Sequence, residues 1–517
     1  MCPPGCFLAM RLTRHGAQNL AECRERYHLR CPTNPVSRTD ENTMHPLKEA
    51  IRAETRRQFF GAAATGIGGL ALATLLPTDA FALSRGHGMA GGLPSLPHFA
   101  PRAKRCIYLH MSGAPPQMDL LDYKPKMQGW YGKELPESIR RGQLTPMLSG
   151  QSRFPVAPSV FRFSQHGQSG AWFSELLPHT ASMADDLAVI RSMHTDATNH
   201  ESAITFLQTG RQSPGLPSLG SWFSYGLGSM NDNLPTFVVM NAERSHPRAG
   251  VPGMSDNLWS AGGLSAAHAV VGLRTECDPV RYLKNAHGAS HAVRRSLLDG
   301  DPETLARIEQ SEVAFKLQSA VPELTDLSSE PDRTFERWGE EAKHAGKFQN
   351  AALMARRLVE RGVRFVQIYH RGWDVHAFAP QVLPAQAHDV DRAAWALIED
   401  LKERGLFDET LVIWGGEFGR TMYAQGRLTP TEYGRDHHPG CFSVWMSGGG
   451  VKGGTVYGET DDFSHNIVKD PVHIRDFQAT ILHLFGIDHE RFAHTQRGLE
   501  LRLAGSSPAR VVHEVVA

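Results

Sequence analysis

The stretch His370-Arg-Gly-Trp-Asp-Val-His376 places an acidic side chain and an imidazole where both could bind one metal ion. Asp374 and His376 are two residues apart, so on an extended or turning loop both side chains can point to the same side. An alternative without a metal is also consistent with this spacing. Asp374 would then cap a turn, and His376 would simply be exposed to solvent.

A second polar stretch, Arg435-Asp-His-His-Pro439, contains two adjacent histidines. Adjacent side chains on a regular strand point to opposite faces, so His437 and His438 cannot both reach one point there. On a loop stiffened by the proline, one histidine can bind a metal while the other, or Asp436, supports it from behind. The alternative is a polar surface loop.

A lone carboxylate, Glu417, follows the apolar run Leu411-Val-Ile-Trp414 and two glycines. Three roles are open to it: a metal ligand, a partner for Arg420, or the N-cap of a following turn. The glycines indicate a close approach of the backbone to another group. The five candidate ligands offer only nitrogen and oxygen atoms; they are Asp374, His376, Glu417, His437 and His438. This donor set predicts a divalent metal, zinc first, with manganese or calcium as alternatives.

A helix start around residue 199 offers a possible anion site. Thr198 and Glu201 have the spacing of a capping box, which predicts a helix beginning at about Asn199 and ending at Gly210. The free N–H groups of a helix N-terminus attract anions, so Thr198, Asn199 and His200 could surround a sulfate, phosphate or carboxylate. A purely structural capped helix accounts for Thr198 and Glu201 but leaves His200 unexplained.

Five apolar runs of strand length must position these residues, and each run is followed by a polar side chain. The runs are Cys106–Leu109, Leu187–Ile190, Phe237–Met240, Phe365–Tyr369 and Leu411–Trp414. Continuous apolar runs predict strands of a mostly parallel sheet buried on both faces. Ligands bind beyond the carboxyl ends of such strands, where His110, His194, His370 and Glu417 fall.

Helical patterns alternate with these runs, which predicts an α/β sandwich. In 389–405 the apolar side chains form one stripe, and Gly405 is suited to end the helix. The segment at about 242–362 begins loop-like and becomes charged and helical, so we interpret it as a helical insertion or cap.

The N-terminal region predicts export. Thr55-Arg-Arg-Gln-Phe-Phe60 reads as a twin-arginine signal, and Ala80-Phe-Ala82 as its cleavage site. We therefore assign 44–82 as the signal peptide, 83–101 as a linker, and 1–43 as a misassigned start or disordered extension before an initiator at Met44. The protein would use the twin-arginine translocase and work in the periplasm or outside the cell.

The charge and cysteine content of the chain after residue 82 limit the classes of partner that we expect. Removal of residues 1–82 takes away 10 of 54 basic and 7 of 54 acidic residues, which leaves a formal net charge of −3. Nothing in this balance predicts a nucleic-acid partner, and no apolar span predicts stable membrane insertion. Cys106, Cys277 and Cys441 remain, which is too few for a disulfide framework.

Several sequence motifs of this chain resemble those of the alkaline phosphatase and sulfatase superfamily. The run 408–419 is similar to the sulfatase strand and turn that carry metal ligands. Thr209-Gly-Arg211 is similar to the end of the sulfatase helix that carries the nucleophile, and 476–486 is similar to a late sulfatase helix. Together with the twin-arginine start, the motifs WDVH, GGEFGRT, GRDHHP and GGGVKGG resemble an uncharacterised exported family of that superfamily, domain-of-unknown-function family 1501.

The resemblance implies an alkaline phosphatase-like three-layer sandwich over 102–505, with 506–517 as a tail, and a metal site facing a sulfate or phosphate ester. It implies metal ligation by Asp374, His376, Glu417 and His437, with His438 as a rival. His200 falls where sulfatases carry their nucleophile, Phe418 replaces a second ligand, and Asp119 is the nearest acid to the end of the first strand.

The sequence therefore predicts an exported metal-dependent hydrolase of a small-molecule or saccharide ester. His200, Thr198 and Arg420 are its candidate catalytic residues. The alternative is a family member that binds a polysaccharide or protein without turnover. Six further polar residues would support the ligands or contact the substrate; they are His110, Asp119, His194, Asn199, His370 and Asp436.

Overall fold

The computed structural model describes residues 92–140, 151–231, 234–242, 270–274, 323–496 and 498–517. The predicted extension (1–43), the signal peptide (44–82) and the first part of the linker lie outside these residues, as does much of the predicted insertion. No helix among the described residues is long and apolar enough to cross a membrane.

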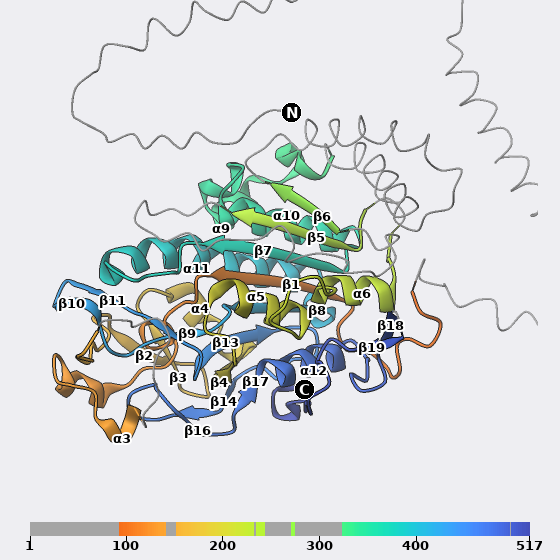
Figure 1. Cartoon of the computed structure of the whole chain (residues 1–517). Coiled ribbons are helices and arrows are strands. Elements are labelled where there is room, and N and C mark those ends of the chain that lie inside the picture. The colour runs from red at the N-terminus through yellow and green to blue at the C-terminus, as the bar shows by residue number, and fades with distance from the viewer. Residues whose placement is uncertain (1–91, 141–150, 232–233, 243–269, 275–322, 497) are drawn as a thin grey trace, which may run out of the picture. The chain divides into compact units, whose positions relative to one another are not determined.

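A nine-stranded sheet forms the centre of the unit that begins at Gly88 (Figure 1). Its order is β14-β4-β13-β8-β1-β7-β5-β6, with β17 also paired to β4. The strands are β1 (Arg105–Ser112), β4 (Leu187–His194), β5 (Phe237–Ala242), β6 (Val270–Arg274), β7 (Phe365–Arg371), β8 (Thr410–Gly415), β13 (Phe442–Ser447), β14 (Thr455–Tyr457) and β17 (Val472–His473). Within this sheet, only β13 runs antiparallel to its neighbours. The five predicted apolar runs all lie in strands of this mostly parallel sheet, so that prediction is confirmed.

Helices cover both faces of the sheet, because alternate strand residues are apolar on both sides. On β1, Ile107 and Leu109 join one core cluster, and Cys106 and Tyr108 join the other. The first cluster includes residues of α4 (Pro178–Ser182), α9 (Asp332–Trp338), α10 (Phe348–Glu360) and α11 (Ala379–Glu403). The second includes residues of α5 (His200–Thr209), α6 (Leu219–Leu227) and α12 (Ile474–Leu484). This is the predicted three-layer α/β sandwich.

Shorter elements complete the described structure. Small antiparallel pairs are β2 (Phe163–His166) with β3 (Ala171–Ser174), β9 (Gly419–Arg420) with β12 (His437–His438), β10 (Gln425–Thr429) with β11 (Glu432–Gly434), β15 (Glu459–Thr460) with β16 (Ile467–Lys469), and β18 (His494–Gln496) with β19 (Leu499–Leu501). Short helices are α2 (Gln117–Leu120) and α3 (Glu137–Arg140).

The structure adds detail in three of the predicted ranges. The helix predicted at 389–405 begins ten residues earlier, at Ala379. The described parts of the range 242–362 include β6, which extends the central sheet beside β5, and α10, which packs into the core. The predicted tail is also packed, since Val512 and Val515 are fully buried.

Candidate metal centre

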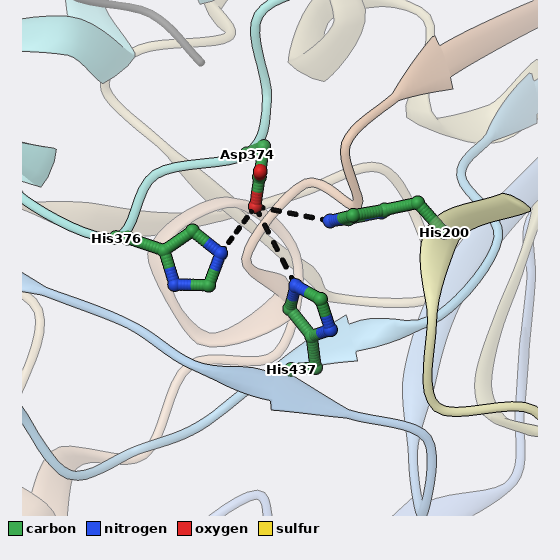
Figure 2. Close-up of side chains that lie close together, drawn as sticks. All are labelled: His200, Asp374, His376 and His437. Carbon is green, nitrogen blue, oxygen red and sulfur yellow. Dashed lines mark ion pairs between the residues drawn. The ribbon is translucent and has the colours of Figure 1, made fainter. Parts of the chain in front are cut away.

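Four side chains from three segments of the chain meet beyond the carboxyl ends of the central strands (Figure 2). His200 is the first residue of α5, Asp374 and His376 lie on the loop after β7, and His437 belongs to β12. Each offers one ligand atom, and these atoms all lie within 4.8 Å of one another. The structure thus brings the predicted Asp374, His376 and His437 together and adds His200, which the sequence suggested as a catalytic group.

The three imidazoles converge on one oxygen atom, Oδ1 of Asp374. Their Nε2 atoms lie 2.8 Å (His376), 3.0 Å (His200) and 3.6 Å (His437) from it. The last distance is too long for a hydrogen bond, and Nε2 of His437 is buried without a hydrogen-bond partner among the described residues.

The opposite nitrogen of each ring, Nδ1, faces an oxygen. Glu417 Oε1 lies 2.5 Å from Nδ1 of His200, Gln425 Oε1 lies 2.5 Å from that of His376, and the Thr198 carbonyl oxygen lies 2.8 Å from that of His437. Amide and backbone carbonyl oxygens only accept hydrogen bonds, and an ionised carboxylate does too. A neutral imidazole therefore carries its proton on Nδ1 and turns the lone pair of Nε2 toward Asp374.

This donor set fits a divalent cation. Three nitrogen lone pairs and a carboxylate oxygen repel one another, and a divalent cation among them would turn this repulsion into attraction. Three imidazoles and one carboxylate oxygen suit zinc or a similar hydrolytic metal, and no thiolate takes part. His200, Asp374, His376 and His437 could hold the metal that the sequence predicts.

The pKa shifts of Asp374 and His200 also favour positive charge at this site. Burial would raise the pKa of Asp374, but its contacts with the three imidazoles and the charge of Arg420 outweigh burial and hold that pKa well below its usual value. Burial would lower the pKa of His200, yet hydrogen bonds to Asp374 and Glu417 raise it. Burial lowers the pKa of His437. A proton on His200 and a metal ion would therefore compete for the same place.

The group is closed on its inner side and opens at His376. The side chains of His437 and His200 are 2% and 9% exposed, whereas those of Asp374 and His376 are 18% and 34% exposed. Phe418 forms part of the inner wall, with its ring centroid 4.8 Å from that of His200 and 4.7 Å from that of His437. Among the described residues, the side of the group that is open to solvent is therefore that of Asp374 and His376.

Arg420 supports Asp374 from inside the protein. Its Nη2 lies 2.5 Å from Asp374 Oδ1, and its Nε donates to the Ala114 carbonyl oxygen at 3.1 Å. Nη1 donates to the Arg435 carbonyl oxygen at 3.2 Å, and the side chain is fully buried. Each nitrogen thus has a partner within the protein, so the structure places Arg420 as a support for Asp374 rather than as a group free to meet a substrate.

Glu417 lies behind the group, not in it. The side chain is fully buried, and the backbone N–H of Gly113 donates to Oε1 at 3.0 Å. Burial would raise its pKa, but contacts with His110 and His200 keep it well below the usual value. The prediction that Glu417 binds the metal directly is therefore corrected. His200 lies between Glu417 and the centre of the group, so Glu417 reaches the site only through that imidazole.

His438 also lies outside the group. On β12 it points away from His437, donates a hydrogen bond from its Nε2 to the His465 carbonyl oxygen at 2.7 Å, and stacks on the His465 ring. Asp436 accepts a hydrogen bond from the backbone N–H of His437 at 2.8 Å. Of the two adjacent histidines, the structure turns His437 toward Asp374.

The other predicted strand-end residues have partners elsewhere. His370 lies 3.2 Å from Asp389, and the ring of His194 lies against that of His473. Asp119 forms a buried ion pair with Arg435, at 2.6 Å. These side chains are not in the candidate metal group.

The start of α5 differs from the predicted capping box. Asn199 is the N-cap, and its side chain accepts a hydrogen bond from the backbone N–H of Glu201 at 3.1 Å. Thr198 contributes its carbonyl oxygen to His437, not its hydroxyl. The predicted end at Gly210 is confirmed, with a left-handed φ of 76°.

Two supports of the site escaped sequence reasoning. Gln425 lies on β10, 49 residues from its partner His376, and nothing in the local sequence marks it. Gly434 lies so close to the His376 loop that a Cβ atom there would be 1.7 Å from the His376 carbonyl oxygen. A glycine beside the RDHHP motif was a signal for such a close approach.

The fold and the site define an α/β protein with a candidate metal centre beyond its strand ends. The family described as "Protein of unknown function (DUF1501)" matches residues 103–516, and the chain belongs to that family. No curated protein matches this chain.

Similar solved structures include members of the alkaline phosphatase and sulfatase superfamily. The lipoteichoic acid synthase LtaP from Listeria monocytogenes is 9% identical, with 78% of this chain and 74% of that chain covered and a TM-score of 0.34. A sulfatase from Pseudoalteromonas sp. is 14% identical (75% and 69% covered, TM-score 0.30). The alkaline phosphatase from the Antarctic bacterium TAB5 is 13% identical (69% and 95% covered, TM-score 0.27). At such scores the likeness carries no argument about activity.

Proposed function

We propose that this protein is an exported, metal-dependent hydrolase of a sulfate or phosphate ester. The observation that carries the proposal is the convergence of three imidazole Nε2 atoms on one oxygen of Asp374. The ester class rests on the sequence motifs that resemble sulfatases and phosphatases. Zinc is the expected metal, and manganese or calcium are the alternatives.

The charges of the site favour an anionic substrate once a metal is bound. Two negative charges, on Asp374 and Glu417, and one positive charge, on Arg420, give the site a formal net charge of −1 when the histidines are counted as neutral. A divalent cation reverses this sum to one positive charge, which attracts an anionic ester. When bound, the metal would supply a Lewis acid that polarises an ester oxygen.

The chain's own residues would bind and orient the reactants. Asp374 and His376 form the exposed side of the group, so the ester would approach there, and Phe418 keeps water from the inner side. Among the described residues, the group contains no hydroxyl or thiol side chain. Water is therefore the nucleophile that we propose, in place of the side-chain nucleophile of sulfatases.

The experiment is elemental analysis of the purified protein, followed by assays with 4-nitrophenyl sulfate and 4-nitrophenyl phosphate. We expect bound zinc and turnover of one ester class, with both lost in Asp374→Ala and His437→Ala. His438→Ala is the matched control, because His438 is equally buried but turns toward His465. It should keep both properties.

One observation favours a second candidate, a member that keeps the metal for structure and binds a polysaccharide or protein without turnover. The side chain at the sulfatase nucleophile position, His200, is held by Glu417 and Asp374 and is not free to attack. Bound metal without turnover of either ester would favour this candidate. Absence of metal from the parent protein, together with no turnover, would contradict both.

Export is proposed from the twin-arginine motif. Replacing Arg56 and Arg57 with lysine should leave the full chain in the cytoplasm of its cells, whereas the parent chain should appear in the periplasmic or extracellular fraction. Equal distribution of the two proteins would contradict this part of the proposal.

A further inference from the structure

A second buried histidine, His110, lies behind the candidate metal group. It is near the end of β1, is fully buried, and its Nε2 lies 3.4 Å from Oε2 of Glu417. It is not in the metal group itself, which it can influence only through Glu417 and His200. Each side chain therefore lies beside the next in the order His110, Glu417, His200 and Asp374.

The two oxygens of Glu417 have unequal surroundings. Oε1 accepts from the Gly113 backbone at 3.0 Å and lies 2.5 Å from Nδ1 of His200. Oε2 is buried and has no hydrogen-bond partner within normal geometry among the described residues. His110 Nε2 lies 3.4 Å from it. An unpaired carboxylate oxygen in a buried site costs free energy, so a donor at this position stabilises the ionised carboxylate.

The fold holds His110 where it can serve this purpose. β1 is central, and His110 pairs with Tyr369 of β7 on one side and Gly415 of β8 on the other. The rings of Tyr108 and Tyr369 pack edge-on against its imidazole, at centroid distances of 5.7 Å and 5.0 Å. Glu417 follows Gly415 by two residues, so the strand register itself brings the two side chains together.

We propose that His110 is a positioning residue for the metal site. Its Nε2–H donates to Oε2 of Glu417, which keeps Oε1 on the Nδ1–H of His200. His200 then presents the Nε2 lone pair to the metal. The inference rests on the proposed metal site and extends it to a residue that touches neither metal nor substrate. Carboxylates that orient a ligating histidine strengthen metal binding, and loss of such a contact costs about 10- to 100-fold in affinity.

The test compares two variants that differ by one methylene. The amide nitrogen of His110→Gln can occupy the position of Nε2, whereas that of His110→Asn stops short of it. Zinc affinity of the full chain is measured by competition with a chromophoric chelator. We expect a loss of about tenfold in His110→Asn, the lower end for an indirect contact, and a loss within about threefold in His110→Gln. Adding His110→Asn to Glu417→Gln should lower the affinity no further.

Tyr108→Phe is the matched control. Tyr108 lies two residues away on the same face of β1, and its buried hydroxyl has no hydrogen-bond partner among the described residues. This variant should bind zinc like the parent. Equal losses in Tyr108→Phe, His110→Gln and His110→Asn would mean that only packing matters, and would overturn the inference. Parent-like affinity in His110→Asn would overturn it too.

A metal-free measurement separates this inference from the proposed function. The ¹⁵N chemical shifts of His200, assigned by difference with His200→Ala, report which ring nitrogen carries the proton. We expect Nδ1–H in the parent and in His110→Gln, and a mixture in His110→Asn. If the parent binds no zinc, the proposed function fails, yet these shifts still decide the role of His110. Identical shifts in all three proteins would contradict it.

Discussion

Two aspartates, the fully buried Asp119 and the partly exposed Asp374, each pair with a buried arginine, but the surroundings of their oxygens differ. Asp119 receives Arg435 Nε on Oδ2 at 2.6 Å and Arg435 Nη2 on Oδ1 at 3.1 Å. Asp374 receives Arg420 on Oδ1 at 2.5 Å, and three imidazole nitrogens crowd that same oxygen. Both arginines direct further donors to backbone carbonyl oxygens.

The difference teaches how a structural ion pair can be told from a candidate site. Around Asp119 each carboxylate oxygen meets a guanidinium nitrogen, so the pair needs nothing from outside. Around Asp374 there are more lone pairs than protons, and the nitrogen of His437 at 3.6 Å has no bond to make. Such an excess of lone pairs calls for a cation.

The largest expected effect comes from breaking the balanced pair. Asp119→Leu leaves the Arg435 charge buried without its partner, so the free energy of unfolding should fall by about 3–5 kcal/mol in urea denaturation. The double variant Asp119→Leu with Arg435→Met removes both charges and should recover most of that loss. A single variant as stable as the parent would show that the two regions do not differ in this way.

The second effect is the stabilisation that a metal adds to the other region. Zinc at about 100 times its dissociation constant should raise the free energy of unfolding by about 2.7 kcal/mol, because it binds the folded state. Thermal unfolding with zinc and with excess chelator measures the difference. His437→Ala should abolish this zinc-dependent increment, and Asp119→Leu should keep it. Equal increments in both variants would contradict the assignment of the site.

The strands and the Asp374 loop could be predicted because their signals are local. Continuous apolar runs mark buried strands, and a spacing of two residues marks Asp374 with His376. The choice between His437 and His438 depends on which face of β12 turns inward, which only the pairing with β9 determines. That pairing sets His437 opposite Arg420, close to Asp374.

Glu417 and His200 were harder to assign, because both lie at the same edge of the sheet. The helix start carries His200 between Glu417 and Asp374, and no local pattern encodes that order. Gln425 is harder still, since a hairpin 49 residues away from His376 brings it to the site. Roles that depend on which side chain lies in front of another therefore need the three-dimensional structure.

A third prediction concerns Gly434, which lies next to Arg435 and against the His376 loop. A Cβ atom at Gly434 would overlap the His376 carbonyl oxygen, and a backbone atom cannot move aside as a flexible side chain can. Gly434→Ala should therefore lower the free energy of unfolding by about 1–3 kcal/mol and weaken zinc binding. Gly129→Ala is the control, because no atom lies within 4 Å of the added carbon. Similar losses in the two variants would contradict a specific close approach.

The smallest effect should come from Gln425, a partly buried support at the open side of the group. Gln425→Leu removes the oxygen that faces Nδ1 of His376, so the ring loses its fixed orientation and the proton is free to move to Nε2. Zinc affinity should fall by about tenfold, equivalent to about 1.4 kcal/mol. Gln425→Glu keeps an acceptor at that position and should bind zinc at least as tightly as the parent.

Because the contact is at the open side of the group, water can replace part of it in Gln425→Leu. The loss should therefore be smaller than that of Glu417→Leu, whose contact with His200 is fully buried, and the reverse order would mean that burial does not set the strength of these supports.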